Sequence, residues 1–233
     1  MMRLDKFLAH TGVGTRSEVK KLIKHGYVMI NHELAFSPNQ IINESTDHIT
    51  YDGKVLIYEP FIYLLLNKPE GYLSSTFDYK TPVVLDLIPE YAHRDLFPVG
   101  RLDIDTTGLL LITDDGDLGH RLTSPKHDVE KEYIATLDQI VPETLIEKFL
   151  TGVVLDDGYR CLPAKLTILK PKLASLVIVE GKYHQVKRMF EAYGITVTSL
   201  RRQRMANITL GDLALGEFRK LTPAELKLLS SLK

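Results

Sequence analysis

Short apolar runs separated by turn residues dominate most of this chain. The runs FIYLLLN, LLLIT, YIATL, KLTIL and SLVIV are aliphatic or β-branched, which is typical of strands. Helical spacing is less frequent and occurs in PETLIEKFLTG (142–152) and HQVKRMFEAYG (184–194). From residue 61 onward the pattern therefore predicts an α+β domain with a mixed, mainly antiparallel sheet flanked by helices. The final TPAELKLLSSLK fits either a capped terminal helix or a fraying end.

The first part of the chain predicts a smaller α/β unit. Apolar residues at helical spacing indicate two short helices, the second capped by Thr15 or Ser17 and ended by Gly26. Beyond them, YVMI and ELAF alternate like the two strands of a hairpin. The stretch YEP at 58–60 is a candidate linker, because its proline ends the preceding strand. We therefore expect domains at 1–58 and 61–233.

Composition is that of an ordinary globular protein. The chain has 233 residues, of which 44% are hydrophobic and 25% charged, so it can bury a core without disulfide or metal staples. Cys161 is the only cysteine, which excludes an intrachain disulfide and a cysteine-based zinc cluster. The N-terminus lacks the apolar stretch of a signal peptide, and no run approaches the ~20 apolar residues of a membrane span. We expect a cytosolic protein without a membrane partner.

Charge is distributed unevenly, although the net charge is −1. Two islands are basic: residues 1–32 carry Arg3, Lys6, Arg16, Lys20, Lys21 and Lys24, and residues 182–204 carry Lys182, Lys187, Arg188, Arg201, Arg202 and Arg204. Either island by itself also fits a solvated charged face. Two of them on an otherwise acidic body indicate a polyanion bound at defined places.

The stretch GRLDIDTTGLLL (100–111) is the main candidate for chemistry. Asp103 and Asp105 lie between an arginine and a run of aliphatic residues, where carboxylates are rarely buried without a partner. A calcium loop is one interpretation, but a strand-like run occupies the second half of the pattern where a helix is needed. A plain surface turn is another, since Thr-Thr-Gly is good turn chemistry. The third is a functional carboxylate at the mouth of a cleft.

This stretch resembles the signature of the pseudouridine synthases that modify ribosomal RNA. The resemblance implies that Asp103, which follows Arg-Leu, is the catalytic residue. Asp105 is not the family's catalytic aspartate, and we expect it to brace the loop by accepting backbone N–H bonds.

Three further stretches resemble the family's motifs in the expected order. LNKPEGYLSST (66–76) is similar to a strand and Lys-Pro turn that support the catalytic loop. KEY (131–133) is similar to the motif whose tyrosine, here Tyr133, stacks on the target base. EGKYHQVKRMF (180–190) is similar to the motif whose basic residue, here Lys187, pairs with the catalytic carboxylate.

The N-terminal stretch RLDKFLAHTGVGTRSEVKKLIKHGYVMINHE separately resembles the S4 RNA-binding module. A module of this type before this catalytic domain implies the branch that modifies small-subunit (16S) ribosomal RNA. The partner implied is ribosomal RNA or a ribonucleoprotein assembly intermediate. Two alternatives stay open: a large-subunit (23S) ribosomal RNA enzyme, and a non-catalytic RNA-binding or ribosome-assembly protein.

The chemistry of this family fits the residues without a cofactor or metal. Isomerising uridine exchanges one glycosidic bond with no net oxidation, and the chain has no GxGxxG, P-loop or Cys/His cluster. Lys187 flanks the apolar stripe of its helix and can reach inward, where an ammonium favours the ionised form of a carboxylate. We expect Arg101 to fill the space that a flipped uridine leaves and Tyr133 to cover the base.

Other basic residues are candidates for phosphate contacts by a monomeric enzyme. They are Arg3, Arg16, Lys20, Lys21 and Lys24 in the first island, and Arg188, Arg201, Arg202 and Arg204 in the second.

Overall fold

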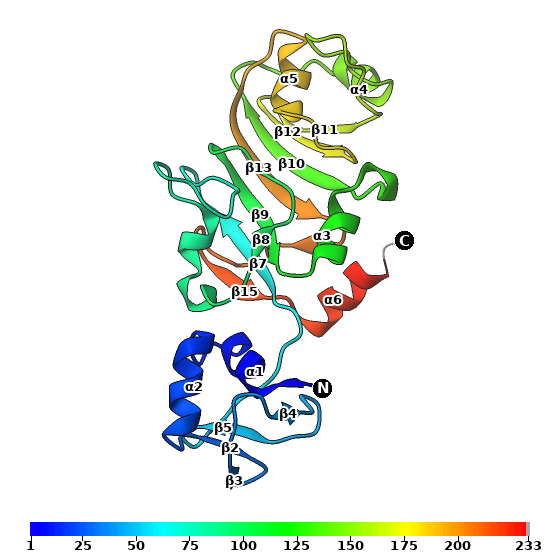
Figure 1. The fold of residues 1–233 in the computed structure, drawn as a ribbon. Helices are drawn as coiled ribbons and strands as arrows, with labels where there is room; N and C mark the ends of the chain where they lie inside the picture. The colour runs from blue at the N-terminus through cyan, green and yellow to red at the C-terminus, as the bar shows by residue number, and fades with distance from the viewer. Residues whose placement is uncertain (232–233) are drawn as a thin grey trace. The chain divides into compact units, whose positions relative to one another are not determined.

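The computed structural model describes residues 1–231, and these fold as two compact units. The first consists of residues 1–62 and 88–96, and the second of residues 63–87 and 97–231. Each unit encloses a hydrophobic core of its own. Figure 1 shows the elements of both units along the chain.

Two short helices and a small sheet form the first unit. Helix α1 spans Leu4–His10 and α2 spans Arg16–Lys24. The sheet has the order β3-β2-β5-β6, with strands Glu33–Leu34, Val28–Ile30, Ile49–Tyr51 and Lys54–Val55, and a separate pair joins β1 (Met2–Arg3) to β4 (Ile41–Ile42). The two helices and the hairpin predicted from the sequence are confirmed.

Local signals in the sequence explain where these elements begin and turn. Thr15 caps α2, because its hydroxyl accepts the Glu18 N–H at 3.3 Å while the Glu18 carboxylate accepts the Thr15 N–H at 2.8 Å. Asn31 and His32 have φ of 50° and 72° and form the two-residue turn between β2 and β3. The first unit is thus specified mainly by short-range chemistry.

Residues 88–96 pack with the first unit, although the sequence places them among those of the second domain. This segment includes the 3-10 helix η2 (Pro89–Tyr91). The Arg94 guanidinium lies 2.8 Å from His10 Nε2 and donates to the carbonyl oxygens of Glu59 and Pro60, each at 3.1 Å. The segment is held by polar contacts to backbone that no periodicity in the sequence could indicate.

A nine-stranded mixed sheet forms the second unit. Seven strands follow the order β11-β12-β10-β13-β9-β7-β15, namely Lys165–Lys170, Leu173–Ile178, Lys131–Leu137, Val197–Met205, Thr106–Thr113, Tyr63–Lys68 and Phe218–Lys220. The short strands β14 (Ile208–Thr209) and β8 (Phe97–Pro98) pair with β13 and β9. Among the described strands, β13 and β9 pair in parallel and the other neighbours are antiparallel, which confirms the predicted fold class.

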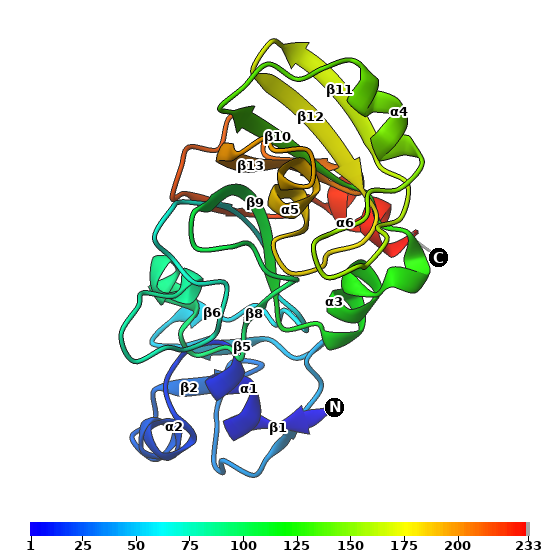
Figure 2. The same cartoon turned by 90° about the horizontal axis from the view of Figure 1, so that it is seen from above.

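Helices cover this sheet in two places. Helices α4 (Thr144–Leu150) and α5 (Gln185–Glu191) pack together through Phe149 and Phe190, whose ring centroids are 5.1 Å apart. Helices α3 (Gly116–Thr123) and α6 (Pro223–Ser230) bury leucines in the same core and lie on one side of the unit (Figure 2). The 3-10 helices η1 (Val84–Leu87) and η3 (Pro125–His127) lie in connections.

The sequence does not predict α3 or β13. Helix α3 is short and contains two glycines, so its apolar pattern is weak, and it depends on Asp115, whose carboxylate accepts the Leu118 N–H at 3.0 Å. Strand β13 contains the sequence LRRQR, which reads as a charged surface segment. Tertiary pairing on both sides of β13 overrides that pattern.

Gly108 allows β9 and β13 to approach closely. Its φ is +103°, and a Cβ built there would lie 2.3 Å from the carbonyl oxygen of Arg202. Only glycine adopts this conformation without strain and leaves room for the neighbouring backbone. The central parallel pair therefore depends on this residue.

We expect Gly108→Ala to destabilise the protein by about 2–5 kcal/mol, because it combines a disfavoured φ with a steric clash. Gly71→Ala is the matched control, since Gly71 has φ +89° and a Cβ added there would meet no other atom within 4 Å. Urea unfolding of both variants measures the difference. Equal losses would contradict a close approach at Gly108.

A charged network fixes the start of α6. The Arg219 guanidinium donates to both oxygens of the Glu225 carboxylate, at 2.7 and 2.8 Å, and the same carboxylate accepts the Thr222 N–H at 2.8 Å. The hydrogen bonds from Arg219 lower the pKa of Glu225 to about 2. Because this pKa lies below its ordinary value of 4.5, ionised Glu225 stabilises the fold above pH 4.5, and that contribution is lost as the pH falls towards 2.

We expect Glu225→Gln to lower the free energy of unfolding by about 1–2 kcal/mol at pH 7, a value reduced for the partial exposure of the pair. The difference from the wild type should shrink between pH 4.5 and 2. Urea unfolding at a series of pH values measures it. A difference that stays constant over this range would show that the ion pair contributes nothing.

Candidate active site

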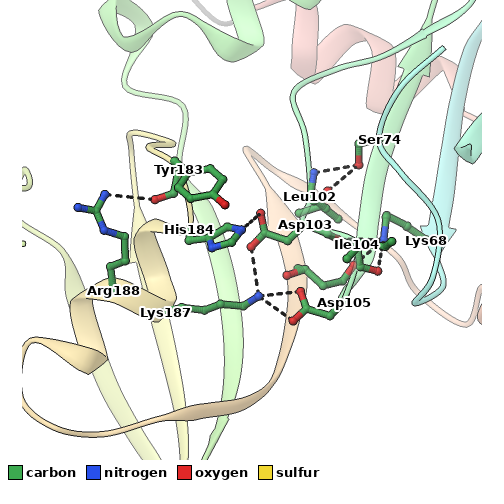
Figure 3. Close-up of polar contacts among 11 residues, drawn as sticks. Lys68, Ser74, Leu102, Asp103, Ile104, Asp105, Tyr183, His184, Lys187 and Arg188 are labelled. Atoms are coloured by element: carbon green, nitrogen blue, oxygen red, sulfur yellow. Dashed lines mark hydrogen bonds and ion pairs between the residues drawn. The ribbon is translucent and has the colours of Figure 1, made fainter. Parts of the chain in front are cut away.

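The loop that carries Asp103 is fixed from below by a buried lysine. Lys68, at the end of β7, is 0% exposed. Four carbonyl oxygens, those of Pro69, Asp103, Ile104 and Thr106, lie within 2.9–3.2 Å of its ammonium and share its three protons. Figure 3 shows Lys68 beside Asp103 and Ile104. Burial lowers the pKa of Lys68 to about 8, while the charges of Asp105 and Asp103 act to raise it. The Lys68 ammonium thus holds the backbone of the Asp103 loop against the turn that follows β7.

Ser74 fixes the same loop from its other end. Its hydroxyl accepts the Leu102 N–H at 3.0 Å and donates to the Leu102 carbonyl at 2.9 Å, and Ser74 itself is buried. The Thr106 N–H also donates to the Asp103 carbonyl, at 3.0 Å. Because the backbone of residues 102–106 is held in this way, the direction of the Asp103 side chain is fixed.

Asp103 faces two basic side chains from the start of α5. Lys187 Nζ lies 3.3 Å from Oδ2, and His184 Nε2 lies 3.6 Å from Oδ1. The Asp103 side chain is 28% exposed, so it remains accessible from solvent. The structure brings together Asp103 and Lys187, which are far apart in the sequence. The family resemblance implies this pairing, and the helical spacing around Lys187 is consistent with it.

Lys187 is shared between two carboxylates. Its ammonium donates to both oxygens of Asp105, at 2.6 and 2.9 Å, and so lies closer to Asp105 than to Asp103. Burial acts to raise the pKa of Asp105, but the hydrogen bonds and charge of Lys187 outweigh it and hold this pKa below its ordinary value. Burial likewise acts to lower the pKa of Lys187, yet the two carboxylates raise it.

The expectation that Asp105 braces the loop through backbone N–H bonds therefore needs correction. The hydrogen bonds of its side chain to another residue go to Lys187. A carboxylate two residues from Asp103 points towards the same ammonium because the turn between them places both side chains on one side of the loop (Figure 3).

His184 is a site residue that the sequence does not single out. It adopts a left-handed conformation, with φ 48°, as the residue before α5. Its ring stacks on Tyr183, with centroids 3.8 Å apart. The sequence does show a histidine directly before the helix that carries Lys187. Nothing in that pattern, however, indicates that the His184 ring turns towards Asp103.

Two adjoining cavities surround Asp103. The larger, about 730 Å³, is lined by Asp103, Asp105, His184 and Lys187 among others, and the smaller, about 60 Å³, by Asp103 and Tyr133 among others. Arg101 is exposed and borders both. Tyr133 lies on β10 and is 8% exposed, so it forms an inner wall. An ionised carboxylate in such a place can act as a nucleophile or as a base.

The remaining predicted RNA contacts differ in how accessible they are. Arg16, Lys20, Lys21 and Lys24 are exposed on α2. Three others form ion pairs: Arg3 with Asp5, Arg188 with Asp156 and Asp157, and Arg204 with Glu130 and Glu132. Arg201 is half-buried on β13. The α2 lysines and arginine are thus the most accessible cations of the set.

Arg202 does not lie on the surface, unlike its neighbours among the predicted contacts. It is 2% exposed, and its Nε donates to the Leu109 carbonyl at 2.7 Å. Arg201 and Arg204 conceal this in the sequence. Alternation along the strand turns Arg201 to the other face, and a register shift opposite Glu132 and Tyr133 places Arg204 beside Glu132.

Neither a metal cluster nor a membrane-crossing helix occurs in the described part of the chain. Within residues 1–231, no group of three or more His, Cys, Asp or Glu side chains is arranged to hold a metal ion. No helix in this range is long and apolar enough to cross a membrane.

Comparison with known proteins identifies the family. Residues 62–192 match the model of the RNA pseudouridylate synthase family, and residues 2–49 match the S4 domain model. The chain is 44% identical to the uncharacterized RNA pseudouridine synthase YtzG of Bacillus subtilis, over 98% of each chain. It is 43% identical to ribosomal small subunit pseudouridine synthase A of Escherichia coli, over 97% of this chain and 98% of the relative.

A solved structure agrees over the full length. The crystal structure of a pseudouridylate synthase superposes with a TM-score of 0.70 at 40% identity, covering 98% of this chain and 100% of the other. The chain therefore belongs to the RNA pseudouridylate synthase family and carries an S4 domain ahead of its catalytic domain.

Proposed function

We propose that this pseudouridine synthase isomerises a uridine of small-subunit ribosomal RNA, with Asp103 as the catalytic residue. The observation that carries the proposal is the Asp103 carboxylate, 3.3 Å from Lys187 Nζ and open to a cavity of about 730 Å³. The 43% identity to a small-subunit enzyme over nearly the whole chain supports the choice of substrate.

The reaction balances without any added reactant. The N1–C1′ bond of uridine breaks, the uracil rotates, and a C5–C1′ bond forms, while C5 loses its proton and N1 gains one. The uracil ring carries the charge of the broken bond on its own oxygens, so a second acid is less necessary than in ordinary glycoside hydrolysis. One carboxylate can therefore serve the whole exchange.

Asp103 can act by three routes, which share one requirement. It can attack C1′, attack the uracil ring, or remove the 2′ proton to give a glycal. Each route needs the carboxylate ionised at neutral pH. Lys187 Nζ and His184 Nε2 lie 3.3 and 3.6 Å from its two oxygens and hold the carboxylate in place for any of the three routes.

The target uridine has to leave its stack to reach Asp103, at a cost of a few kcal/mol. Arg101, exposed at the border of both cavities, is the side chain that fills the vacated position, since guanidinium planes stack on bases. Tyr133 covers the flipped uracil from the inner wall of the smaller cavity. The exposed basic face of α2, made of Arg16, Lys20, Lys21 and Lys24, grips phosphates elsewhere on the RNA.

Mapping pseudouridine in total ribosomal RNA from cells with and without this protein tests the substrate. The proposal requires the loss of one pseudouridine from the small-subunit RNA. Loss from the large-subunit RNA would select the other ribosomal substrate, and an unchanged map of both would favour a binding protein.

We expect Asp103→Asn to reduce tritium release from RNA labelled with 5-³H-uridine by about 10³-fold or more, because the amide is neither a nucleophile nor a base. RNA affinity should change little. Asp105→Asn is the matched control, since Asp105 also binds Lys187 but is not assigned a bond-making role. We expect it to lose ~10-fold or less. A larger loss for Asp105→Asn than for Asp103→Asn would reassign the catalytic residue.

We expect Lys187→Met to lower kcat for tritium release by about 10-fold or more, because Asp103 and Asp105 lose the ammonium that both carboxylates contact. Lys187→Arg keeps the positive charge and should restore most of the activity. Initial rates of tritium release at saturating RNA measure both. A Lys187→Met variant with the wild-type kcat would show that this contact plays no part in the reaction.

A further inference from the structure

A third cavity lies beside those at Asp103, and its lining does not include that aspartate. Its volume is about 270 Å³, and its lining includes Lys131, Glu180 and Arg202. It shares Arg101 and Tyr133 with the small cavity at Asp103. A ligand that extends beyond the target base would therefore meet this cavity next.

Arg202 lines this cavity and carries an unsatisfied donor. It lies on β13 directly opposite Tyr133 of β10, and paired residues of neighbouring strands present their side chains on one face. Its Nε is bonded to the Leu109 carbonyl, while its Nη2 is buried without a hydrogen-bond partner. A buried donor left in this way costs about 1–3 kcal/mol, so a ligand oxygen that accepts from it stabilises the complex.

Lys131 supplies a second buried cation. It precedes Tyr133 by two residues on β10, hence on the same face, and is 8% exposed. Its ammonium donates to the carbonyl oxygens of Val129 and Val179, at 2.9 and 3.2 Å, which leaves one of its three protons available. Burial lowers the pKa of Lys131 to about 8, and the nearby charge of Arg202 acts in the same direction.

Positive charge exceeds negative charge around this cavity. Its lining contains four basic side chains, those of Arg101, Lys131, Lys182 and Arg202, and one carboxylate, that of Glu180. Glu180 accepts its hydrogen bonds from three uncharged groups, and within residues 1–231 no ion pair joins Lys131 or Arg202 to a carboxylate. Because buried charges are normally paired, this excess favours an anionic ligand.

We propose that this cavity binds a backbone phosphate of the RNA, next to the uridine that enters the Asp103 cavity. The proposal rests on the assignment of RNA to that neighbouring site. A phosphate matches the two donors better than a base does, because it brings the negative charge that Lys131 and Arg202 lack and accepts from a guanidinium and an ammonium at once. When this cavity holds the phosphate and Arg101 occupies the place of the flipped base, the backbone beside the target nucleotide is fixed in position.

Thr123 offers a test that leaves the buried cations in place. It is exposed at the end of α3, borders the cavity, and makes its side-chain hydrogen bond to the Gly119 carbonyl at 2.9 Å. We expect Thr123→Glu to weaken binding of a ribosomal RNA fragment by about 10-fold at low salt, and less above ~0.5 M, because a carboxylate there repels a phosphate. Thr123→Gln has the same size without the charge and should bind within about twofold of the wild type. Equal affinities of the two variants would overturn the proposal.

Lys131→Met tests the cation itself. If one phosphate is neutralised here, the slope of log K against log salt should become shallower by about 0.7–0.9. Lys170→Met, at an exposed position on β11 away from the cavity, should leave the slope unchanged. Circular dichroism establishes that both variants are folded. A folded Lys131→Met with the wild-type slope would overturn the proposal.

Methylphosphonate substitution in the same RNA fragment locates the phosphate. Removing its charge should weaken binding to the wild type by about 10-fold at one position beside the modified uridine, and should cost Lys131→Met nothing further at that position. The same penalty for both proteins at every position would place the contact elsewhere and overturn the proposal. These binding measurements do not depend on turnover, so they distinguish failure of this inference from failure of Asp103 as the catalytic residue.

Discussion

The burial of one ammonium group, that of Lys68, is the constraint on which the site depends. A lysine with no exposed surface is unfavourable unless its donors are used, and here four backbone carbonyls within residues 69–106 surround it. Those carbonyls come from the turn after β7 and from the loop before β9, so the cation ties two segments that are distant in sequence. The loop conformation that aims Asp103 is therefore set by the strand beneath it.

The conformation of this loop also determines how its two carboxylates meet Lys187. The turn at residues 103–105 presents two carboxylates towards Lys187, and the ammonium lies nearer to Asp105 than to Asp103. Asp105 thus holds Lys187 in place, while Asp103 keeps part of its carboxylate open to the cavity. Sharing between the two carboxylates therefore fixes the position of the ammonium and leaves the Asp103 oxygens less fully occupied than those of Asp105.

Much of this could be predicted from the sequence, for reasons that differ by element. The helices of the first unit follow from caps and apolar spacing, and the strand–loop–strand around Asp103 follows from its aliphatic runs and its motif. The proximity of Lys187 to Asp103 was expected from the family resemblance of EGKYHQVKRMF, and the place of Lys187 beside a buried helical stripe agrees with it. His184, Ser74 and the burial of Arg202 could not be predicted, because each depends on which face of an element meets a partner from a remote segment. Strand β13 could not be predicted for the same reason. Its arginines indicate an exposed segment, whereas the strand pairs with β9 on one side and β10 on the other.

The register of the sheet positions both the cavity at Asp103 and the neighbouring cavity that contains Arg202. Gly108 of β9 pairs with Lys68 on one side and Arg202 on the other, and Arg202 in turn pairs with Tyr133. This row crosses four strands and carries, in order, the cation under the Asp103 loop, a residue without a side chain, the arginine of one cavity and the tyrosine that lines both. Gly108 has no Cβ, so β13 can approach β9 and Arg202 can reach the Leu109 carbonyl. A one-residue slip of β13 against β9 or β10 would turn Arg202 or Tyr133 to the opposite face, so the Asp103 loop and the two cavities are positioned by a single register.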